Sequence, residues 1–407
     1  MKRVLPAAAH DPDAQADGLA DPSFAADLIA WQRQHGRHSL PWQNTTDAYR
    51  IWLSEIMLQQ TQVAAVIPYY RKFLLRFPNV DVLAAAPAED VMAHWSGLGY
   101  YSRARNLHRC AQQVVTQHAG IFPADPAALA ELPGIGRSTA AAITAFAYGT
   151  RAAIMDGNVK RVFARVFGID TYPGERRTEE QMWKLAVGLL PPEPEYGNAD
   201  ANANAAGDPP AGTPMQSYTQ GLMDLGATLC IRSRPACERC PLAARCVALA
   251  TGRTATLPVR KPSKATPQKH AVMLVVTHGD EVLLQRRPDS GIWGGLLSLP
   301  ELDGFTASVP EVVEGAAARE AFEAAVARNL ARFGEVCSTT PLQPFAHGFT
   351  HFKLHVVPHR VTLSKRQEVA GETDHVWLNT ATIAAAPLPA PIKKLLLALF
   401  DRDDLFA

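Results

Sequence analysis

Four cysteines lie close together in the sequence, with the spacing C-x6-C-x2-C-x5-C from Cys230 through Cys237 and Cys240 to Cys246. Four thiolates this close suit one metal centre better than they suit positions in a hydrophobic core. The spacing alone leaves the metal open, because zinc also accepts four thiolates. The cluster therefore predicts a bound metal but does not identify it.

A second candidate site is the segment Leu132–Arg137, which reads Leu-Pro-Gly-Ile-Gly-Arg and precedes a helical pattern. A Gly-x-Gly turn at the start of a helix, here Gly134 and Gly136, offers free backbone N–H groups to a phosphate. Pro-Gly turns between helices are common, so the turn alone does not establish a phosphate site.

Two carboxylates could carry acid–base chemistry. The immediate neighbours of Glu55 are apolar, and a dehydrated carboxyl has a raised pKa that suits a general acid near neutral pH. The alternative is a polar stripe facing water, and spacing alone does not decide. Asp156 precedes a glycine and a helix expected to begin near Val159, so local sequence favours a capping aspartate over a site residue.

The elements that must position these residues are mostly helices in the first part of the chain. Apolar residues recur at helical spacing from Ser23 to about Leu190. The helices are expected at Tyr49–Ile67, Ala88–His94, Arg103–His118, Ala127–Glu131, Ser138–Tyr148, Val159–Phe167, Glu179–Leu190 and Tyr218–Leu229. Residues 1–21 are expected to be a disordered tail, residues 198–214 a flexible insert, and residues 251–267 a linker.

The pattern changes after the linker. His270–Thr277 and Glu281–Arg287 are expected to be strands of a hairpin, Ala316–Arg332 a helix and Thr350–Val357 a further strand. Residues 268–407 therefore form a separate α+β domain.

Length and composition limit the number of domains and the class of protein to which the chain can belong. With 407 residues and 47% hydrophobic content, two or three domains with real cores are expected. No apolar run approaches the roughly 20 residues that a bilayer span needs, and no secretory signal is recognised. We therefore expect a cytoplasmic protein without a membrane partner, in which six cysteines are not a disulfide framework.

The net charge is only +1, but basic residues gather in two segments. Residues 96–165 hold eight Lys or Arg against three acids, and residues 229–264 hold eight against Glu238 alone. Segregated basic segments predict a nucleic-acid-binding face, because contacts to phosphates supply most non-specific affinity.

Several motifs together resemble a known family. The helix Trp52–Val63, the run Gly97–Asn106, the hairpin, Met155–Arg161 and the cysteine cluster occur in this order. They resemble the helix-hairpin-helix DNA glycosylases with an iron–sulfur cluster, and within them the adenine-specific branch, over residues 22–250. The resemblance implies a mainly α glycosylase domain (a helix-hairpin-helix, six-helix barrel with an iron–sulfur cluster domain) joined to a C-terminal Nudix-like α+β domain. It implies a 4Fe–4S cluster on the four cysteines and a monomer associated with the bacterial nucleoid.

The resemblance also implies roles for single residues. Glu55 would protonate the departing adenine, Asp156 would stabilise the sugar cation, and Asn158 would orient Asp156 and the water. The remaining DNA and base contacts would come from Gly134 and Gly136 at the phosphate, Gln60 and Tyr100 in the opened duplex, and Leu40, Trp42, Val63 and Gln220 around the base. The substrate implied is double-stranded DNA with adenine opposite 8-oxoguanine or guanine.

Ser138 separates two branches of this family. The endonuclease III branch has a lysine at this place, whose amine forms a Schiff base with the sugar. A hydroxyl cannot form an imine, so Ser138 argues for a monofunctional glycosylase without strand cleavage. An oxidised-pyrimidine glycosylase with lyase activity remains an alternative, as does a non-catalytic DNA-binding protein.

The C-terminal domain raises a different alternative, a nucleotide pyrophosphatase. A Nudix hydrolase holds Mg²⁺ with several glutamates, and here Gly295 and Glu301 fit the motif, while 17 residues separate them from Arg319 and Glu320 and a second paired glutamate is absent. The domain is therefore expected to serve recognition. Phe349, Thr350 and His351 match the family loop that inspects the damaged guanine.

Overall fold

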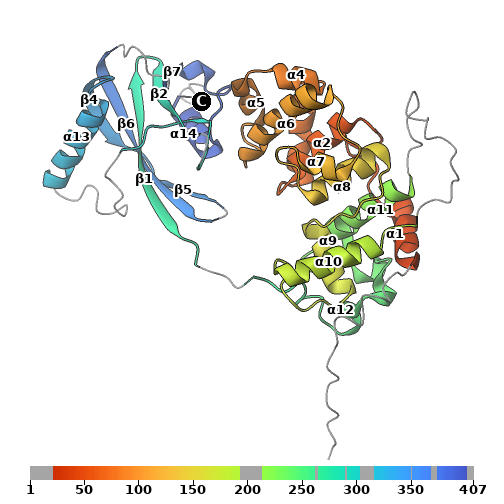
Figure 1. Cartoon of the computed structure of the whole chain (residues 1–407). Coiled ribbons are helices and arrows are strands. Elements are labelled where there is room, and N and C mark those ends of the chain that lie inside the picture. The colour runs from red at the N-terminus through yellow and green to blue at the C-terminus, as the bar shows by residue number, and fades with distance from the viewer. Residues whose placement is uncertain are drawn as a thin grey trace, which may run out of the picture. The chain divides into compact units, whose positions relative to one another are not determined.

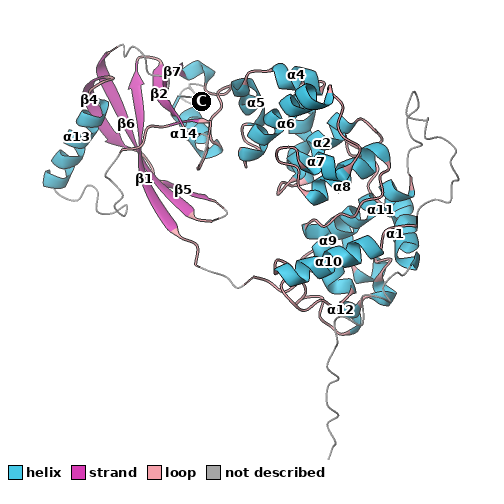
Figure 2. Cartoon of the chain, viewed as in Figure 1, coloured by secondary structure: helices cyan, strands magenta, loops and turns pink. Residues whose placement is uncertain are grey.

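The computed structural model describes residues 22–192, 213–261, 265–288, 291–302, 316–349, 351–367 and 374–400. These residues form two compact units, one drawn from residues 1–85 and 106–262 and the other from residues 86–105 and 263–407 (Figure 1). The first unit is helical and the second is built around a sheet (Figure 2). The predicted fold class, a mainly α part followed by an α+β part, is confirmed. Among the described helices, none has the length and apolar character that a bilayer span requires.

Short helices make up the first unit. They are α1 (Pro22–His35), α2 (Ala48–Leu58), α3 (Val63–Arg76), α4 (Val80–Ala85), most of α6 (Ser102–His118), α7 (Pro126–Ala130), α8 (Arg137–Tyr148), α9 (Gly157–Val166), α10 (Arg176–Gly188), α11 (Pro214–Asp224) and α12 (Val247–Ala250). The prediction of a single helix over Tyr49–Ile67 is wrong, because the helix is interrupted between Leu58, where α2 ends, and Val63, where α3 begins. Gln60 lies in the left-handed region, with φ of +57°, and a right-handed helix cannot pass through that conformation.

Side-chain caps fix where the helices begin. Asp47, Asp125 and Asp156 accept hydrogen bonds from backbone N–H groups at the starts of α2, α7 and α9. Thr213 and Gln216 form a reciprocal capping box at the start of α11. The last two residues of the predicted insert therefore belong to this helix start, while residues 198–212 and the predicted tail 1–21 lie outside the described residues.

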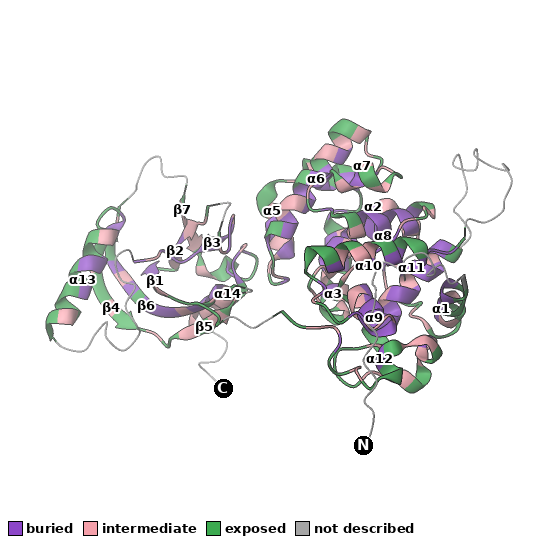
Figure 3. Ribbon diagram, turned by 60° about the horizontal axis from the view of Figure 1, so that its bottom comes forward, coloured by how far each residue is buried: buried purple, intermediate pink, exposed green. Residues whose placement is uncertain are grey.

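The core of the first unit brings together helices that are distant in sequence. A cluster of buried apolar residues joins α1, α8, α9, α10 and α11, and Figure 3 shows their buried faces. The buried side of α8 is mostly alanine, which allows close approach to α2, α7 and α11. The same packing extends into the predicted linker. Leu257 is buried, and its carbonyl accepts from Arg165 Nε at 2.9 Å, so the first half of that segment packs against the helices.

The second unit contains α5 (Ala88–Trp95) and a mixed sheet. Its strands are β1 (Gln268–His278), β2 (Glu281–Arg286), β3 (Leu297–Ser298), β4 (Gly334–Pro341), β5 (Phe345–Gly348), β6 (Lys353–Arg366) and β7 (His375–Asn379). The order is β3-β2-β1-β6-β4, with β5 paired to β6 and β7 paired to β2. Only the β1–β6 pair among these is parallel. Helix α13 (Ala316–Leu330) covers one face through Phe322 and Val326, and α14 (Ala390–Phe400) ends the described chain.

The predicted β1–β2 hairpin is confirmed, but the predicted strand Thr350–Val357 is partly wrong. Strand β6 begins at Lys353, and Phe349 lies in the connection that follows β5. The Phe349 N–H donates to the Phe352 carbonyl at 2.8 Å, which closes that connection as a turn. Phe349 and His351 therefore lie on a hairpin end, and Thr350 lies outside the described residues.

Candidate active site and cysteine cluster

A cavity of about 1050 Å³ opens in the first unit between the segment before α2, α2 itself and α11. Its wall includes Leu40, Trp42, Val63 and Gln220, together with Glu55. The structure thus brings together the four residues predicted to surround a base and the predicted general acid. The cavity is large enough and has enough apolar surface to hold a purine.

Glu55 faces this cavity from α2. Burial raises the pKa of its carboxyl to about 8, and the negative charge of Asp156 acts in the same direction. The alternative of a polar stripe facing water therefore does not describe Glu55. A carboxyl with this pKa is protonated at neutral pH and can donate a proton to a leaving group.

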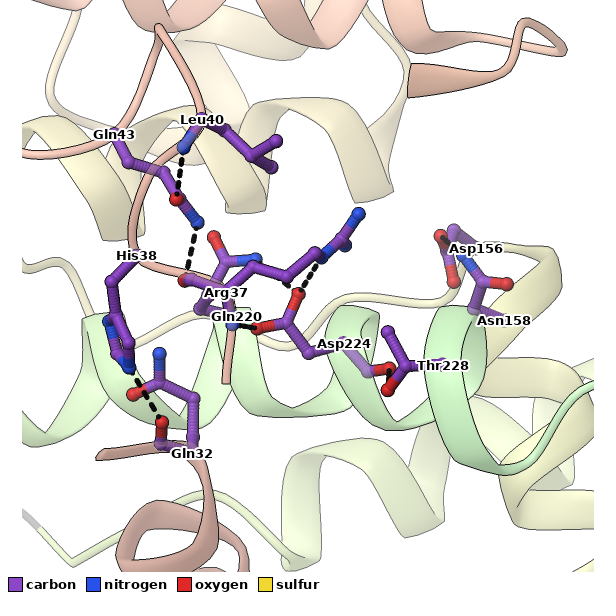
Figure 4. A network of polar contacts seen from close by, with 10 residues as sticks. All are labelled: Gln32, Arg37, His38, Leu40, Gln43, Asp156, Asn158, Gln220, Asp224 and Thr228. Carbon is purple, nitrogen blue, oxygen red and sulfur yellow. Dashed lines mark hydrogen bonds and ion pairs between the residues drawn. The ribbon is translucent and has the colours of Figure 1, made fainter. Parts of the chain in front are cut away.

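Asp156 is both a cap and a member of the site. Its Oδ1 accepts from the Val159 N–H at 2.8 Å, which caps α9, and its Oδ2 accepts from Asn158 Nδ2 at 3.2 Å (Figure 4). Burial raises its pKa, while these hydrogen bonds and the charge of Arg161 oppose the rise. The capping interpretation from the sequence is correct, and it does not exclude a role beside Glu55.

Sequence reasoning missed the part played by Arg161. Its Nη2 donates to Asn158 Oδ1 and to the Gly226 carbonyl, each at 2.7 Å, and its Nε donates to the Cys230 carbonyl at 2.7 Å. Gly226 lies in a π-helical turn, η2 (Leu225–Leu229), whose wider winding frees carbonyl groups. One guanidinium therefore joins the Asp156–Asn158 pair to the first cysteine, a link that only the folded arrangement reveals.

Gly226 also approaches Asn158 closely. A Cβ added at Gly226 would lie 2.5 Å from the Asn158 Cβ, so a larger residue would displace the side chain that contacts Asp156. The sequence alone contains no other indication of this contact than a glycine four residues before the first cysteine.

The two hairpin glycines differ in what they require. Gly134 has φ of +80°, and an added Cβ would lie 2.8 Å from the Asn106 Cβ, so both conformation and space demand glycine. Gly136 is the N-cap of α8, and an added Cβ there would meet nothing. It is exposed, so its surroundings are open to an approaching anion.

Ser138 does not present a free hydroxyl. Its Oγ accepts from the Met155 N–H at 2.8 Å, in the residue before Asp156. The residue at the lysine position of the lyase branch thus helps to place the carboxylate.

Gln60 and Tyr100, predicted to enter the opened duplex, belong to different units. Each is a non-glycine residue with positive φ, and each is exposed. Arg103 lies over the Tyr100 ring at 5.3 Å from its centroid. Strained, exposed residues of this kind are more frequent at functional sites than elsewhere.

The four cysteines line one small, otherwise apolar cavity. Arg165 Nη1 donates to Cys230 Sγ at 3.4 Å, and the Cys246 thiol donates to the Arg165 carbonyl at 3.5 Å. Burial raises the pKa of Cys240 to about 11, and the other three thiols add to the rise, so thiolates here need a bound cation. Within the described ranges, no three Cys, His, Asp or Glu side chains are arranged around a single metal ion. A shared cavity with soft donors on its wall fits a cluster of several metal atoms.

A basic cleft of about 330 Å³ lies beside the start of α9. Its wall includes Lys160, Arg161, Arg232 and Arg260, which come from both basic segments of the sequence. Lys160 is paired with Glu179 at 2.7 Å, whereas Arg232 and Arg260 are exposed. The fold therefore joins the two segments into one positive surface that suits phosphates.

In the second unit, Phe349 belongs to an aromatic group. Its ring stacks on Phe352 with centroids 4.7 Å apart and meets the edge of His347 at 4.8 Å, while His351 is exposed. Glu301, one residue of the degraded Nudix metal motif, accepts from Arg287 Nη1 at 2.7 Å.

Family models and relatives match most of this chain. The family model described as HhH-GPD superfamily base excision DNA repair protein matches residues 53–187, and the NUDIX domain model matches residues 271–398. The adenine DNA glycosylase of Buchnera aphidicola subsp. Acyrthosiphon pisum (strain APS) is 32% identical over 374 residues, which cover 92% of this chain and 96% of that protein. The adenine DNA glycosylase of Homo sapiens is 33% identical and covers 69% of this chain, which in turn covers 57% of the human protein.

Among solved structures, a thermostable thymine-DNA glycosylase is 26% identical, with a TM-score of 0.47, over 59% of this chain and 100% of that one. The family relationship does not depend on that likeness, because the sequence matches span most of the chain. The chain therefore belongs to the family of the adenine DNA glycosylases (MutY), base-excision-repair enzymes that hydrolyse N-glycosyl bonds.

Proposed function

We propose that this chain removes adenine paired with 8-oxoguanine or guanine in double-stranded DNA, acting as a monofunctional glycosylase and as a monomer in the bacterial cytoplasm. The observation that carries the proposal is Glu55, which lies on the wall of a cavity large enough for a purine and whose pKa is raised to about 8 by burial and by the charge of Asp156. One protonated and one ionised carboxylate are the pair that hydrolysis of a glycosidic bond requires.

The mechanism begins with extrusion of the adenine into the cavity, at a cost of a few kcal/mol. Gln60 and Tyr100 occupy the gap, and Gln220 hydrogen-bonds the base. Glu55 donates its proton to a ring nitrogen as the bond from the sugar to the base breaks, so the base leaves as neutral adenine. Asp156 stabilises the cationic sugar. Water adds to the sugar carbon and gives up its proton to the Glu55 carboxylate, which returns to its starting form. Asn158 holds Asp156 through the 3.2 Å hydrogen bond.

We propose further that Cys230, Cys237, Cys240 and Cys246 hold a 4Fe–4S cluster. The fit rests on four soft thiols around one apolar cavity. When bound, the cluster supplies cross-links that fix the segment between Cys230 and Cys246. Arg161 and Arg165 then connect this segment to α9, and the exposed Arg232 and Arg234 face solvent where phosphates can bind.

Protein purified without oxygen is expected to be brown and to contain about four irons per chain. Metal analysis and the visible absorption spectrum check this. A colourless and fully active preparation with one zinc per chain would refute the cluster.

The test of the function is base release from matched duplexes. Adenine is placed opposite 8-oxoguanine, guanine or thymine, and free nucleotides are assayed in parallel. The proposal requires adenine release from the first two duplexes, with strand breaks only after added alkali. Nicking without alkali would favour the lyase, pyrophosphate release would favour the Nudix hydrolase, and binding without either product would favour a DNA-binding protein.

We assign reading of the opposite base to the C-terminal domain. Adenine is a normal base, so selectivity must come from the partner strand, which the residues around the flipped adenine cannot also contact. Deletion of residues 268–407 is expected to leave adenine excision but to reduce the preference for 8-oxoguanine over guanine as the opposite base. Single-turnover rates on the two duplexes measure that preference, and an unchanged ratio would contradict the assignment.

Point substitutions give the cleaner form of this test. The deletion also removes partners of residues before it, such as the Leu388 carbonyl that accepts from Ser96 Oγ at 3.0 Å. Phe349→Ala and His351→Ala are expected to lower the preference in the same direction. Phe400→Ala, which removes a ring that packs against Arg360 in the same unit, serves as the matched control.

A further inference from the structure

Asp224 is a buried charge beside the cavity that the mechanism above does not use. It lies on α11, one turn after Gln220, and its side chain has no exposed surface. Its Oδ1 accepts from Arg37 Nε at 2.6 Å, and its Oδ2 accepts from the Arg37 backbone N–H at 2.8 Å. These are the partners that a carboxylate inside a protein needs, and Arg37 supplies both of them.

The same carboxylate contacts the residue proposed to read the base. Gln220 Nε2 donates to Asp224 Oδ1 at 2.8 Å, as Figure 4 shows. A side-chain amide can turn over and exchange its oxygen and nitrogen, but an ionised carboxylate only accepts hydrogen bonds. Asp224 therefore permits one orientation of Gln220, with the nitrogen toward Asp224. The amide oxygen and the second N–H remain for a molecule in the cavity, whose wall includes Gln220.

We propose that Asp224 is a positioning residue that sets the choice of base by fixing the Gln220 amide. This inference rests on the proposed function. In the fixed orientation, Oε1 accepts from the exocyclic amine of adenine, and the second Nε2–H donates to a neighbouring ring nitrogen. Hypoxanthine has a carbonyl oxygen in place of the amine, so two acceptors would face each other. A site built to bond a donor rejects a base that lacks it.

Through Arg37, Asp224 also connects Gln220 to the segment before α2, which forms another part of the cavity wall. Arg37, which it holds, begins a segment in which Gln43 Nε2 donates to the Arg37 carbonyl at 2.9 Å. The Gln43 oxygen accepts from the Leu40 N–H at 3.0 Å. One buried carboxylate thus sets the Gln220 amide relative to Leu40, which also lines the cavity, so a base in the cavity meets a preformed arrangement of side chains.

The test compares the release of adenine and hypoxanthine from otherwise identical duplexes, each opposite 8-oxoguanine. The quantity measured is the ratio of the two single-turnover rates. In Asp224→Leu the amide can adopt both orientations, while Arg37, which is partly exposed, can turn to water. The adenine-to-hypoxanthine ratio is expected to fall by about tenfold or more relative to the unchanged protein.

A merely structural role would give a different result. It would slow both bases equally and leave the ratio unchanged, and that outcome in a folded variant would overturn the proposal. Asp224→Asn, which keeps the size but offers a donor as well as an acceptor, repeats the test if Asp224→Leu does not fold, and the same fall is expected. Thr228→Val is the matched control, because its hydroxyl donates only to the Asp224 main-chain carbonyl, at 2.8 Å.

The measured rates distinguish a failure of the proposed function from a failure of the role of Asp224. If the unchanged protein releases no adenine from any duplex, the proposed function fails and this inference falls with it. If it releases adenine but the ratio is the same in the Asp224 variants, only the role of Asp224 is wrong.

Discussion

Glu55→Gln is expected to bind adenine-containing duplexes as the unchanged protein does and to lose adenine release. The amide keeps the size of the side chain but cannot donate an acidic proton. General acids contribute on the order of 10²–10⁴-fold to rate, so the single-turnover rate should fall by that range. Base release and duplex affinity, measured on the same preparation, separate chemistry from binding. Glu180→Gln makes the same chemical change at an exposed position on α10 and should alter neither quantity.

The pH dependence of the unchanged protein provides an independent check on Glu55. The protonated form is the active one, and burial places the pKa near 8 in the free protein. The rate should therefore be maintained below about pH 8 and decline above it. Glu55→Gln should lack this decline, and a variant that keeps a near-normal rate would show that another group is the acid.

Asp156→Asn is expected to reduce adenine release on the order of 10²-fold or more, because it removes the charge that faces the developing sugar cation. Asparagine caps helices about as well as aspartate, and its oxygen can still accept from the Val159 N–H. The melting temperature should therefore change little. Rate and melting temperature measured together would show whether the charge or the cap matters.

Asp125→Asn is the matched control for this substitution. Asp125 caps α7 by accepting from the Ala128 N–H at 2.9 Å, and it makes the same kind of contact away from the cavity. If both variants lose activity equally, the loss comes from removing the charge of a helix cap in general and not from removing a charge that faces the sugar. If Asp156→Asn keeps its normal rate of adenine release, Asp156 does not have the role assigned to it.

The sequence predicted elements with strong local signals and failed where tertiary contacts decide. The helices α6, α8 and α9 were located within two residues, because apolar spacing and capping residues mark them. The break between α2 and α3 was missed, since Gln60 has positive φ without being glycine. Strands β4, β5 and β7 were not predicted, and β6 is longer than predicted, because exposed and buried positions mix along them.

The site residues likewise include some that local sequence predicts and others that depend on tertiary contacts. Residues were predicted individually from type and spacing, but spacing could not decide whether Glu55 faced water or a cavity. That answer depends on which helix packs opposite α2, which is a long-range property. Arg161, Gly226 and Asp224 were missed for the same reason, because an arginine, a glycine and an aspartate in a helical segment carry no local sign of a partner 65 or more residues away.

The elevated pKa of Glu55 also makes the folding equilibrium depend on pH. The ordinary pKa of this side chain is 4.5 and the folded value is about 8, so between these values folding takes up a proton from solvent. The contribution of this group to the free energy of unfolding is fully present below about pH 4.5 and is lost as pH rises toward 8. A carboxylate held in an ion pair has the opposite dependence. Around neutral pH the acid that serves the reaction thus makes the native state less stable than a neutral residue of the same shape would.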